Sequence, residues 1–281
     1  MGIINKILPK SLKSFSRHIG YNLKAQVYKI RSFNKTINSS PIFILGNQKS
    51  GTSVIASLLG KYINRETSID LAYANFNYKL YKYLKANKIS IDDFVNHNKL
   101  EFSNEIIKEP HLSIFYPQLR IRFPKSKFIM IIRNPIHNIR SILDRLDIKG
   151  NKNKLDKFDK KKYVYSWKLL LNNSWINGEK QHYIETLAER WNIIANIYLN
   201  NKNEFTLIKY EDFLENKTKN ISKLAYNLNF KEKNDISNFI NKQYQPKGKK
   251  RDKNPIDFFG KKNYNRILVI CEINMKKLGY L

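Results

Sequence analysis

The stretch from Pro41 to Leu59 constrains the fold more than any other part of the sequence. An apolar run (Ile-Phe-Ile-Leu, 42–45) is followed by a turn bounded by Gly46 and Gly51, and then by a second apolar run. This order predicts a buried strand, a tight turn and a helix over residues 53–62. Such a turn aims backbone N–H groups and the positive end of a helix dipole at one point, where an anion can bind.

The polar residues of the turn favour an anion site over a purely structural corner. Lys49 lies inside the turn, and three residues with hydroxyl groups, Ser50, Thr52 and Ser53, surround Gly51. The loop is nevertheless a poor match to a nucleoside-triphosphate site. The Walker A pattern places its lysine directly after the second glycine, where this chain has Thr52.

A second chemical motif follows the apolar run 127–132, which predicts a central strand buried on both faces of a parallel sheet. The run ends in Arg133, where a kinase-type site would have a carboxylate that helps to hold magnesium. Ser141 follows eight residues later, on a helix that we expect to begin at Pro135. Because ligands of open α/β sheets bind at the carboxyl ends of the strands, Arg133 and Ser141 can converge there on one phosphate.

Together the two motifs resemble the sulfotransferases that use 3′-phosphoadenosine 5′-phosphosulfate (PAPS). Gly-x-x-Lys-Ser-Gly-Thr-Ser after a strand is similar to the family's 5′-phosphosulfate loop, although Gln48 stands where the family usually has proline. The Arg…Ser pair is similar to the family's 3′-phosphate site. The resemblance spans residues 40–281 and implies PAPS as co-substrate, with no metal. It implies that PAPS is bound by Gly46, Lys49, Ser50, Gly51, Thr52, Ser53, Arg133 and Ser141.

Three weaker matches extend this resemblance. Lys209-Tyr-Glu-Asp is similar to a family segment and implies that Tyr210 contacts adenine, the alternative being a tyrosine packed on the core. Lys247 and Gly248 resemble a late loop that closes over the 3′-phosphate. Val54 stands where many cytosolic members stack a tryptophan on adenine, so the chain looks closer to bacterial and Golgi-type relatives that act on glycans, lipids or proteins.

The resemblance implies in-line transfer of a sulfuryl group to a hydroxyl or amine acceptor, which can be a carbohydrate, a lipid or a small metabolite. Lys49 is expected to stabilise the transferring group and the departing phosphate. A general base must take the acceptor proton. We expect Asp70 or Glu66 in this role, because glycan- and tyrosine-modifying relatives place an acidic base near these positions.

His111 is the next candidate for the base, together with Glu109. The segment Lys108-Glu-Pro-His resembles the Lys-x-His segment of the small-molecule branch, with the histidine displaced by one position. For each candidate, a solvated acid or a surface histidine without a catalytic role is the alternative.

The composition sets the range of partners. The chain of 281 residues carries 52 Lys and Arg against 23 Asp and Glu, a formal net charge of +29. This charge favours anionic partners such as nucleotides, acidic glycans or an anionic membrane surface. The alternative explanation of the charge is codon bias, because an AT-rich genome produces a composition rich in Lys, Asn and Ile. We expect no specific nucleic-acid partner.

The single cysteine, Cys271, excludes an internal disulfide and is spaced as a core residue of a helix. No stretch reaches the apolar length of a membrane span and no signal-peptide core appears, so the expected location is the cytoplasm. A basic N-terminal extension, residues 1–39, carries short apolar clusters. It predicts packing on the domain or partial disorder, with a peripheral membrane contact as the alternative.

The alternation of strand and helix patterns predicts one α/β domain over residues 40–281, a three-layer P-loop-like fold with a central parallel sheet flanked by helices. Further strands are expected within 104–110 and at 205–208, with a turn or short strand at 65–70. The Lys-rich segment 148–162 predicts a surface loop, and a lid over an anionic substrate is a further hypothesis. Helices are expected over 71–84, from Ser90, over 111–122, from Pro135, over 184–198, from 209 to about 240, and up to Gly279.

Two other classes of function stay open at this point. A P-loop kinase or NTPase is disfavoured by the position of Lys49 and by Arg133 in place of an acid. A non-catalytic protein that binds polyanions or nucleic acid is supported by net charge alone.

Overall fold

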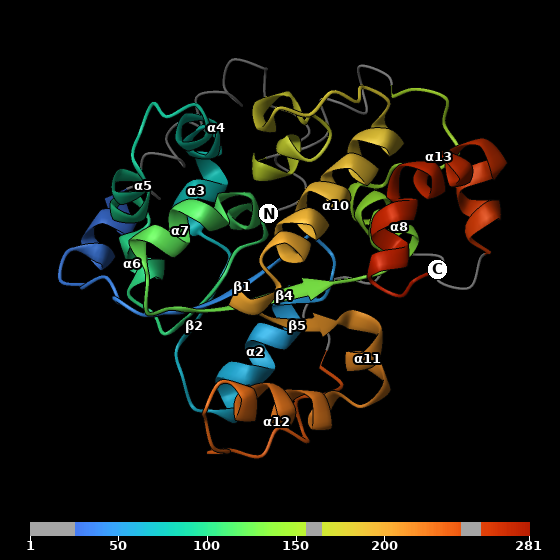
Figure 1. The fold of residues 1–281 in the computed structure, drawn as a ribbon. Coiled ribbons are helices and arrows are strands. Elements are labelled where there is room, and N and C mark those ends of the chain that lie inside the picture. Colours follow the sequence, from blue (N-terminus) through green and yellow to red (C-terminus); the bar gives the residue numbers. More distant parts are fainter. Residues whose placement is uncertain (1–25, 156–164, 243–253) are drawn as a thin grey trace, which may run out of the picture.

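The computed structural model describes residues 26–155, 165–242 and 254–281, and a five-stranded parallel sheet forms the centre of this part (Figure 1). The strand order is β2-β3-β1-β4-β5, and every neighbouring pair is parallel. The predicted α/β fold with a central parallel sheet is therefore confirmed. The strands are β1 (Ile42–Gly46), β2 (Thr67–Ile69), β3 (Ile106–Lys108), β4 (Lys127–Ile132) and β5 (Phe205–Lys209).

The two central strands, β1 and β4, are buried on both faces. Phe43 and Leu45 of β1 point into one hydrophobic core, while Ile42 and Ile44 point into a second core on the opposite face. This alternation explains why both strands read as continuous apolar runs in the sequence rather than as alternating apolar and polar residues.

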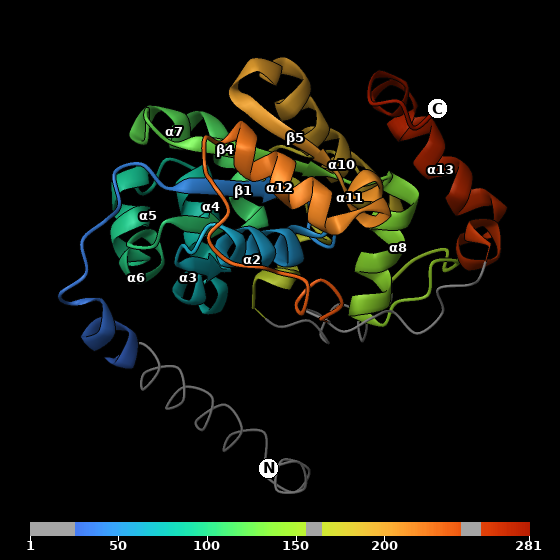
Figure 2. The ribbon, with the colours of Figure 1, turned by 90° about the horizontal axis from the view of Figure 1, so that it is seen from below.

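Helices cover both faces of the sheet, which completes the three layers. On one face lie α2 (Thr52–Tyr62) and α12 (Lys217–Asn227), which contact each other (Figures 1 and 2). On the other face lie α8 (Pro135–Leu146), α10 (Tyr183–Asn200) and α13 (Pro255–Lys277), which also contact one another.

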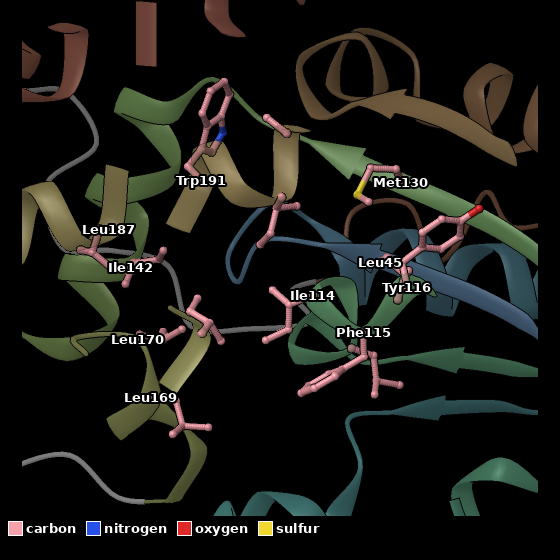
Figure 3. Packing of buried hydrophobic residues seen from close by; sticks show 14 of the residues in the cluster. Leu45, Ile114, Phe115, Tyr116, Met130, Ile142, Leu169, Leu170, Leu187 and Trp191 are labelled. Carbon is pink, nitrogen blue, oxygen red and sulfur yellow. The ribbon is translucent and has the colours of Figure 1, made fainter. Parts of the chain in front are cut away.

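The larger core links the sheet to α8 and α10. Figure 3 shows Leu45 of β1 and Met130 of β4 in the same apolar layer as Trp191 and Ile142. The indole N–H of Trp191 donates to the carbonyl oxygen of Arg133 at 2.8 Å. Packing in the core therefore holds the backbone of Arg133, the residue that follows β4.

The predicted helix over residues 71–84 is wrong in one respect. The structure has two short helices there, α3 (Ala72–Phe76) and α4 (Lys79–Lys85). They are separated at Asn77, which takes non-helical dihedrals (φ −97°, ψ 59°). Asparagine hydrogen-bonds readily to local backbone outside helices, so it is a natural point for such a break.

Two further helix predictions need correction. Residues 111–122 are not one α-helix, because a 3₁₀ helix (Pro110–Phe115) precedes α7 (Tyr116–Arg122). A proline lies in the first turn of each helix, where its missing N–H costs nothing. In the C-terminal part, α11 (Tyr210–Glu215) and α12 are followed by turns over residues 228–242 rather than by a helix that reaches residue 240.

The helix expected from Ser90 is confirmed as α5 (Ile91–His97), and a short α6 (Lys99–Phe102) follows it. Ser90 caps α5 through a capping box, in which Asp93 N–H donates to the Ser90 hydroxyl and Ser90 N–H donates to the Asp93 carboxylate.

Cys271 of α13 is buried in the hydrophobic core. Burial raises the pKa of its thiol, as expected for a structural cysteine.

Part of the basic extension packs on the domain. Residues 26–32 are helical, and the buried Tyr28 hydroxyl donates to Glu101 of α6 at 2.6 Å. Residues 1–25 lie outside the described part of the chain, as do residues 156–162 of the predicted Lys-rich loop. The start of that loop is anchored, because Tyr183 OH donates to the Gly150 carbonyl at 2.7 Å. None of the helices in the described part combines the length and apolar character needed to cross a membrane.

Candidate active site

A cavity of about 680 Å³ lies at the carboxyl ends of the central strands and collects most of the predicted site residues. Its volume falls within the range of small-molecule sites in proteins. The predicted residues that line it are Lys49, Gly51, Thr52, Ser53, Asp70, Lys108, Glu109, His111, Arg133, Ser141 and Tyr210.

Side chains hold three carbonyl groups of the loop between β1 and α2. Ser113 Oγ donates to the Gly46 carbonyl at 3.0 Å, Ser50 Oγ to the Asn47 carbonyl at 2.6 Å, and Asn138 Nδ2 to the Gln48 carbonyl at 2.8 Å. Gly51, Thr52 and Ser53, at the start of α2, line the cavity with their N–H groups at the helix N-terminus. Such groups have no partner within their own helix and are suited to bind an anion.

Lys49 has an unusual backbone conformation. Its φ is 65°, in the left-handed region that non-glycine residues rarely adopt. Arg133 Nη1 donates to the Lys49 carbonyl at 2.9 Å and helps to hold it in this conformation. Local strain of this kind is typical of functional loops.

Gly51 brings Tyr210 against the loop. Gly51 has φ 96°, and a Cβ placed there would lie 2.2 Å from Cδ2 of the Tyr210 ring. The guanidinium of Arg133 lies 4.8 Å from the centroid of the same ring. Only glycine at position 51 permits this packing, so the loop, β4 and α11 meet at one end of the cavity.

One face of α8 supplies a further set of polar side chains. His137, Ser141 and Asp144 recur at the helical spacing of four and three residues, with Arg140 beside them, and all four line the cavity. Burial, with the nearby Arg133 second, lowers the pKa of His137. Burial raises the pKa of Asp144, while Arg140 and Lys49 oppose that shift.

The other end of the cavity is built around an ion pair between Lys108 and Asp70. The Lys108 ammonium is buried at the end of β3 and contacts the Asp70 carboxylate, which is 44% exposed. Asp70 follows β2, and its backbone N–H donates to the Lys108 carbonyl at 2.9 Å. The pairing of β2 with β3 thus places Asp70 beside Lys108 in the cavity lining.

Glu109 follows Lys108 in the chain and also lines the cavity. It is only 3% exposed, and its two carboxylate oxygens accept from the N–H groups of Leu71 and His111 at 3.1 and 2.9 Å. Burial raises the pKa of Glu109 to about 7, and the negative charge of Asp70 adds to the shift. Two carboxylates with different environments therefore lie side by side.

His111 is also buried, and its partner is a buried arginine. Arg190 of α10 has no exposed surface, and its Nη2 lies 3.2 Å from His111 Nδ1. Burial lowers the pKa of His111 well below its usual value, and Arg190 and Lys108 lower it further. Burial also lowers the pKa of Arg190, to about 10, which leaves it protonated at neutral pH.

Some predicted residues are not part of the cavity lining. Glu66 is exposed and precedes β2, at the amino edge of the sheet, whereas Asp70 follows the same strand at the carboxyl edge. Gly46 and Ser50 support the loop from behind. Lys247 and Gly248 lie outside the described residues.

Several cavity residues were not singled out from the sequence, including Arg140, Asp144, Asn75, Ser166 and Trp167. Arg190 was missed as well, although it left a trace in the sequence. It occupies the apolar face of α10, three residues after Leu187 and four before Ile194. Charged residues are rarely buried without a partner, so an arginine on the apolar face of a helix predicts a buried polar contact. In the described ranges, no three His, Cys, Asp or Glu side chains come together in a way suited to a metal ion.

A family model for the sulfotransferase domain matches residues 39–268. The site and the fold thus define a sulfuryl-transferring enzyme with a P-loop-like sheet. The chain belongs to the sulfotransferase family, the PAPS-dependent family that its two anion motifs resemble. No curated protein matches the sequence.

Solved sulfotransferase structures resemble this one at low sequence identity. One from Mycobacterium avium is 10% identical, with 90% of this chain and 81% of that chain covered and a TM-score of 0.55. A mouse sulfotransferase complexed with PAP is 14% identical, with 89% of each chain covered and a TM-score of 0.48. One from Alicyclobacillus acidocaldarius is 14% identical, with 83% and 96% covered and a TM-score of 0.44. The first of these likenesses supports the fold assignment.

Proposed function

We propose that the cavity binds PAPS between two anion sites and transfers its sulfuryl group to a hydroxyl or amine of a polar acceptor. The observation that carries this proposal is the meeting of Lys49, Arg133 and Ser141 in one cavity. PAPS carries a phosphosulfate at its 5′ end and a phosphate at its 3′ position, so it needs two separate groups of donors. A nucleoside triphosphate has no 3′-phosphate for Arg133 and Ser141 to bind.

The groups in the cavity fit this ligand. The start of α2, with Thr52 and Ser53, offers N–H and hydroxyl donors to the phosphosulfate end. Arg133 offers a guanidinium and Ser141 a hydroxyl to the 3′-phosphate. The ring of Tyr210 lies between the loop and Arg133, at the end of the cavity that we assign to the nucleoside.

Lys49 is the proposed catalytic residue on the donor side. Bound PAPS supplies a sulfuryl group whose bridging oxygen gains negative charge as the bond to sulfur breaks. The Lys49 ammonium neutralises that charge, together with the helix N-terminus. Removing one such donor typically lowers the rate by about 10²- to 10³-fold.

Asp70 is the proposed general base. The ion pair with Lys108 engages Oδ1, and no group in the described residues donates to Oδ2, so that oxygen is open to an acceptor proton. Glu109 is the weaker candidate because both of its oxygens already accept backbone N–H groups. A proton taken by Asp70 would remove a negative charge that raises the pKa of Glu109.

The acceptor is proposed to enter beside Asp70, where Asn75, Ser166 and Trp167 line the cavity. Ser166 Oγ donates to Asn75 Oδ1 at 2.6 Å, and Trp167 is half-buried. An aromatic face next to neutral hydrogen-bonding groups suits a polar organic acceptor. Carbohydrate, lipid and small-metabolite acceptors all fit this description.

The described end of the N-terminal extension supports a peripheral membrane contact as an additional proposal. Val27, Ile30 and Phe33 are 47, 76 and 82% exposed on the helix of residues 26–32 and its end, next to the exposed Lys29 and Arg31. Apolar groups flanked by cations are typical of helices that rest on anionic bilayers. Co-sedimentation with phosphatidylserine vesicles tests it, and a Phe33→Ser variant should sediment less.

A screen of hydroxyl and amine acceptors with sulfate-labelled PAPS tests the proposed reaction. Transfer of label that requires the enzyme and disappears in Lys49→Ala supports it. Absence of transfer from PAPS to every acceptor class, by protein that binds adenosine 3′,5′-bisphosphate, would contradict the assignment of Asp70 and Lys49 to catalysis.

A further inference from the structure

Buried Arg190 determines what His111 can do in the cavity. Arginine carries only N–H donors, so any atom that hydrogen-bonds its guanidinium must be an acceptor. The atom that faces Arg190 Nη2 at 3.2 Å is His111 Nδ1. His111 is therefore neutral, with a bare Nδ1, and its single ring proton lies on Nε2.

The position of Arg190 makes this arrangement firm. The side chain has no exposed surface, and its Nε donates to Gln48 Oε1 at 3.4 Å. A buried guanidinium has lost its hydration, so separating it from the acceptors around it is costly. The nearby Glu109 carboxylate attracts it and helps to hold it in place.

Nε2 is the free side of the imidazole. His111 lines the cavity, and no group in the described ranges hydrogen-bonds its Nε2. The Tyr81 ring packs against the histidine ring with centroids 4.9 Å apart, and the His111 backbone N–H is held by Glu109. The ring thus has a fixed orientation, with one N–H available to a ligand.

We infer that His111 acts as a neutral hydrogen-bond donor through Nε2–H, with Arg190 as the residue that positions it, and that it does not serve as the general base. The oxygen that accepts this hydrogen bond belongs either to the transferring sulfuryl group or to the acceptor. To act as a base at Nε2, the ring would need a proton on Nδ1, and that proton would face the Arg190 N–H. This inference rests on the proposed function only for the identity of the accepting oxygen.

The charges around His111 agree with this role. Arg190 of α10 and Lys108 of β3 are the cations that face it, Glu109 is the adjacent acid, and Tyr81 of α4 is the remaining titratable neighbour. Both cations oppose a positive imidazolium, and burial opposes it further. All of these effects favour the neutral ring.

Nitrogen NMR of histidine-labelled, full-length protein without ligand tests the inference directly. The His111 signal, assigned from its loss in His111→Gln, should show a protonated Nε2 and a bare Nδ1, unchanged between about pH 8 and about pH 6. His97 is the internal control for the opposite tautomer, because its Nδ1 lies 2.6 Å from the Asp93 carbonyl oxygen. A His111 signal with protonated Nδ1, or one that becomes imidazolium in this range, would overturn the inference.

Variants of Arg190 test its positioning role. In Arg190→Met, Nδ1 loses its donor, so the His111 signal should become a mixture of tautomers that titrates. In Arg190→Lys, which keeps a donor and a cation, the wild-type signal should persist. An unchanged signal in folded Arg190→Met would contradict the positioning role, and if neither variant folds, the wild-type titration still decides the tautomer.

Activity measurements identify the accepting oxygen. Gln places an N–H near the position of Nε2, so His111→Gln should stay within about tenfold of wild type, while His111→Ala should lose about 10²-fold. A loss confined to kcat assigns the bond to the sulfuryl group, and a loss in KM for the acceptor assigns it to the acceptor. A neutral-pH limb of the rate profile that vanishes in His111→Gln would show that His111 is the base after all. Because the NMR result needs no turnover, failure of this inference is separable from failure of the proposed function.

Discussion

The two ends of the cavity are built in different ways. The donor end, where we propose that PAPS binds, uses short stretches of sequence: the loop with Lys49 and the segment that runs from Arg133 to Ser141. The acceptor end, where we propose that the acceptor binds, joins Lys108 of β3, Asp70 after β2 and Arg190 of α10. These residues lie far apart in the sequence. The donor end is a local structure, whereas the acceptor end exists only when the whole fold is assembled.

This difference has a chemical counterpart. The donor end, as we propose it, would bind anions with backbone N–H groups, hydroxyls and cations. The acceptor end holds the buried side chains of Lys108, Glu109 and Arg190. Burial raises the pKa of Glu109 and lowers that of Arg190. Substitutions at the donor end should therefore change binding and charge stabilisation, and those at the acceptor end should change proton transfer.

The largest expected effect tests the donor end. Lys49→Ala should lower kcat by about 10³-fold, because the departing phosphate loses the cation that we assign to it. Transfer of label from PAPS to the acceptor found in the screen measures the effect. Lys82→Ala removes an exposed lysine of α4 and should leave kcat unchanged. Full activity in Lys49→Ala would remove the basis of the proposed mechanism.

The next effect tests the acceptor end. Asp70→Asn should lower kcat by about 10²-fold with little change in the KM for PAPS, because only proton removal is lost. Glu66→Gln is the matched control: Glu66 lies at the opposite edge of the sheet and should tolerate the change. Comparable losses in both variants would show that Asp70 acts through something other than its position in the cavity.

A smaller effect tests the second anion site. Arg133→Ala should weaken the binding of adenosine 3′,5′-bisphosphate by about 2–3 kcal/mol, roughly 30- to 150-fold, as expected for loss of a charge-assisted hydrogen bond. The binding of AMP, which lacks the 3′-phosphate, should be weakened much less. Calorimetric titration of both nucleotides measures the difference, and equal losses would mean that Arg133 supports the loop rather than the 3′-phosphate.

The smallest effect separates the buried acid from the buried histidine. The pKa of Glu109 is raised to about 7 by burial and by Asp70, so its contribution to stability is present at low pH and is lost as pH rises through 7. The pKa of His111 is lowered by burial, so its contribution is present above about 6.5 and is lost as pH falls. The two contributions therefore have opposite signs.

Urea unfolding between about pH 5 and about pH 8 measures these contributions. Relative to Glu109→Gln, the wild type should lose on the order of 1–2 kcal/mol of unfolding free energy as pH rises. Relative to His111→Gln, it should lose stability as pH falls. Parallel curves for wild type and Glu109→Gln would show that the acid is not held in a raised-pKa environment.

The sequence predicted the donor end well because its features are local. The spacing of Gly46, Lys49 and Gly51 between two apolar runs fixes a strand, a turn and a helix. The apolar run before Arg133 places that residue at the carboxyl edge of the sheet. Regular periodicity likewise predicted α8, α10 and the central strands, since burial on known faces leaves a pattern in the residues themselves.

The acceptor end was predicted only in part, because its contacts are set by strand direction and long-range packing. Glu66 and Asp70 are four residues apart, yet the three-residue strand between them sends them to opposite edges of the sheet. His111 was a candidate base on sequence grounds, and its contact with Arg190 joins residues 79 positions apart. No local pattern records such a pairing.

Calorimetric titration of the full-length protein with adenosine 3′,5′-bisphosphate, AMP and ATP–Mg²⁺ tests the central claim, that the cavity joins two separate anion sites. The account predicts that the bisphosphate binds about 10²-fold more tightly than AMP, through Arg133 and Ser141. It also predicts tighter binding of the bisphosphate than of ATP–Mg²⁺. Tighter binding of ATP–Mg²⁺ would contradict the account and return the chain to the kinase or NTPase class.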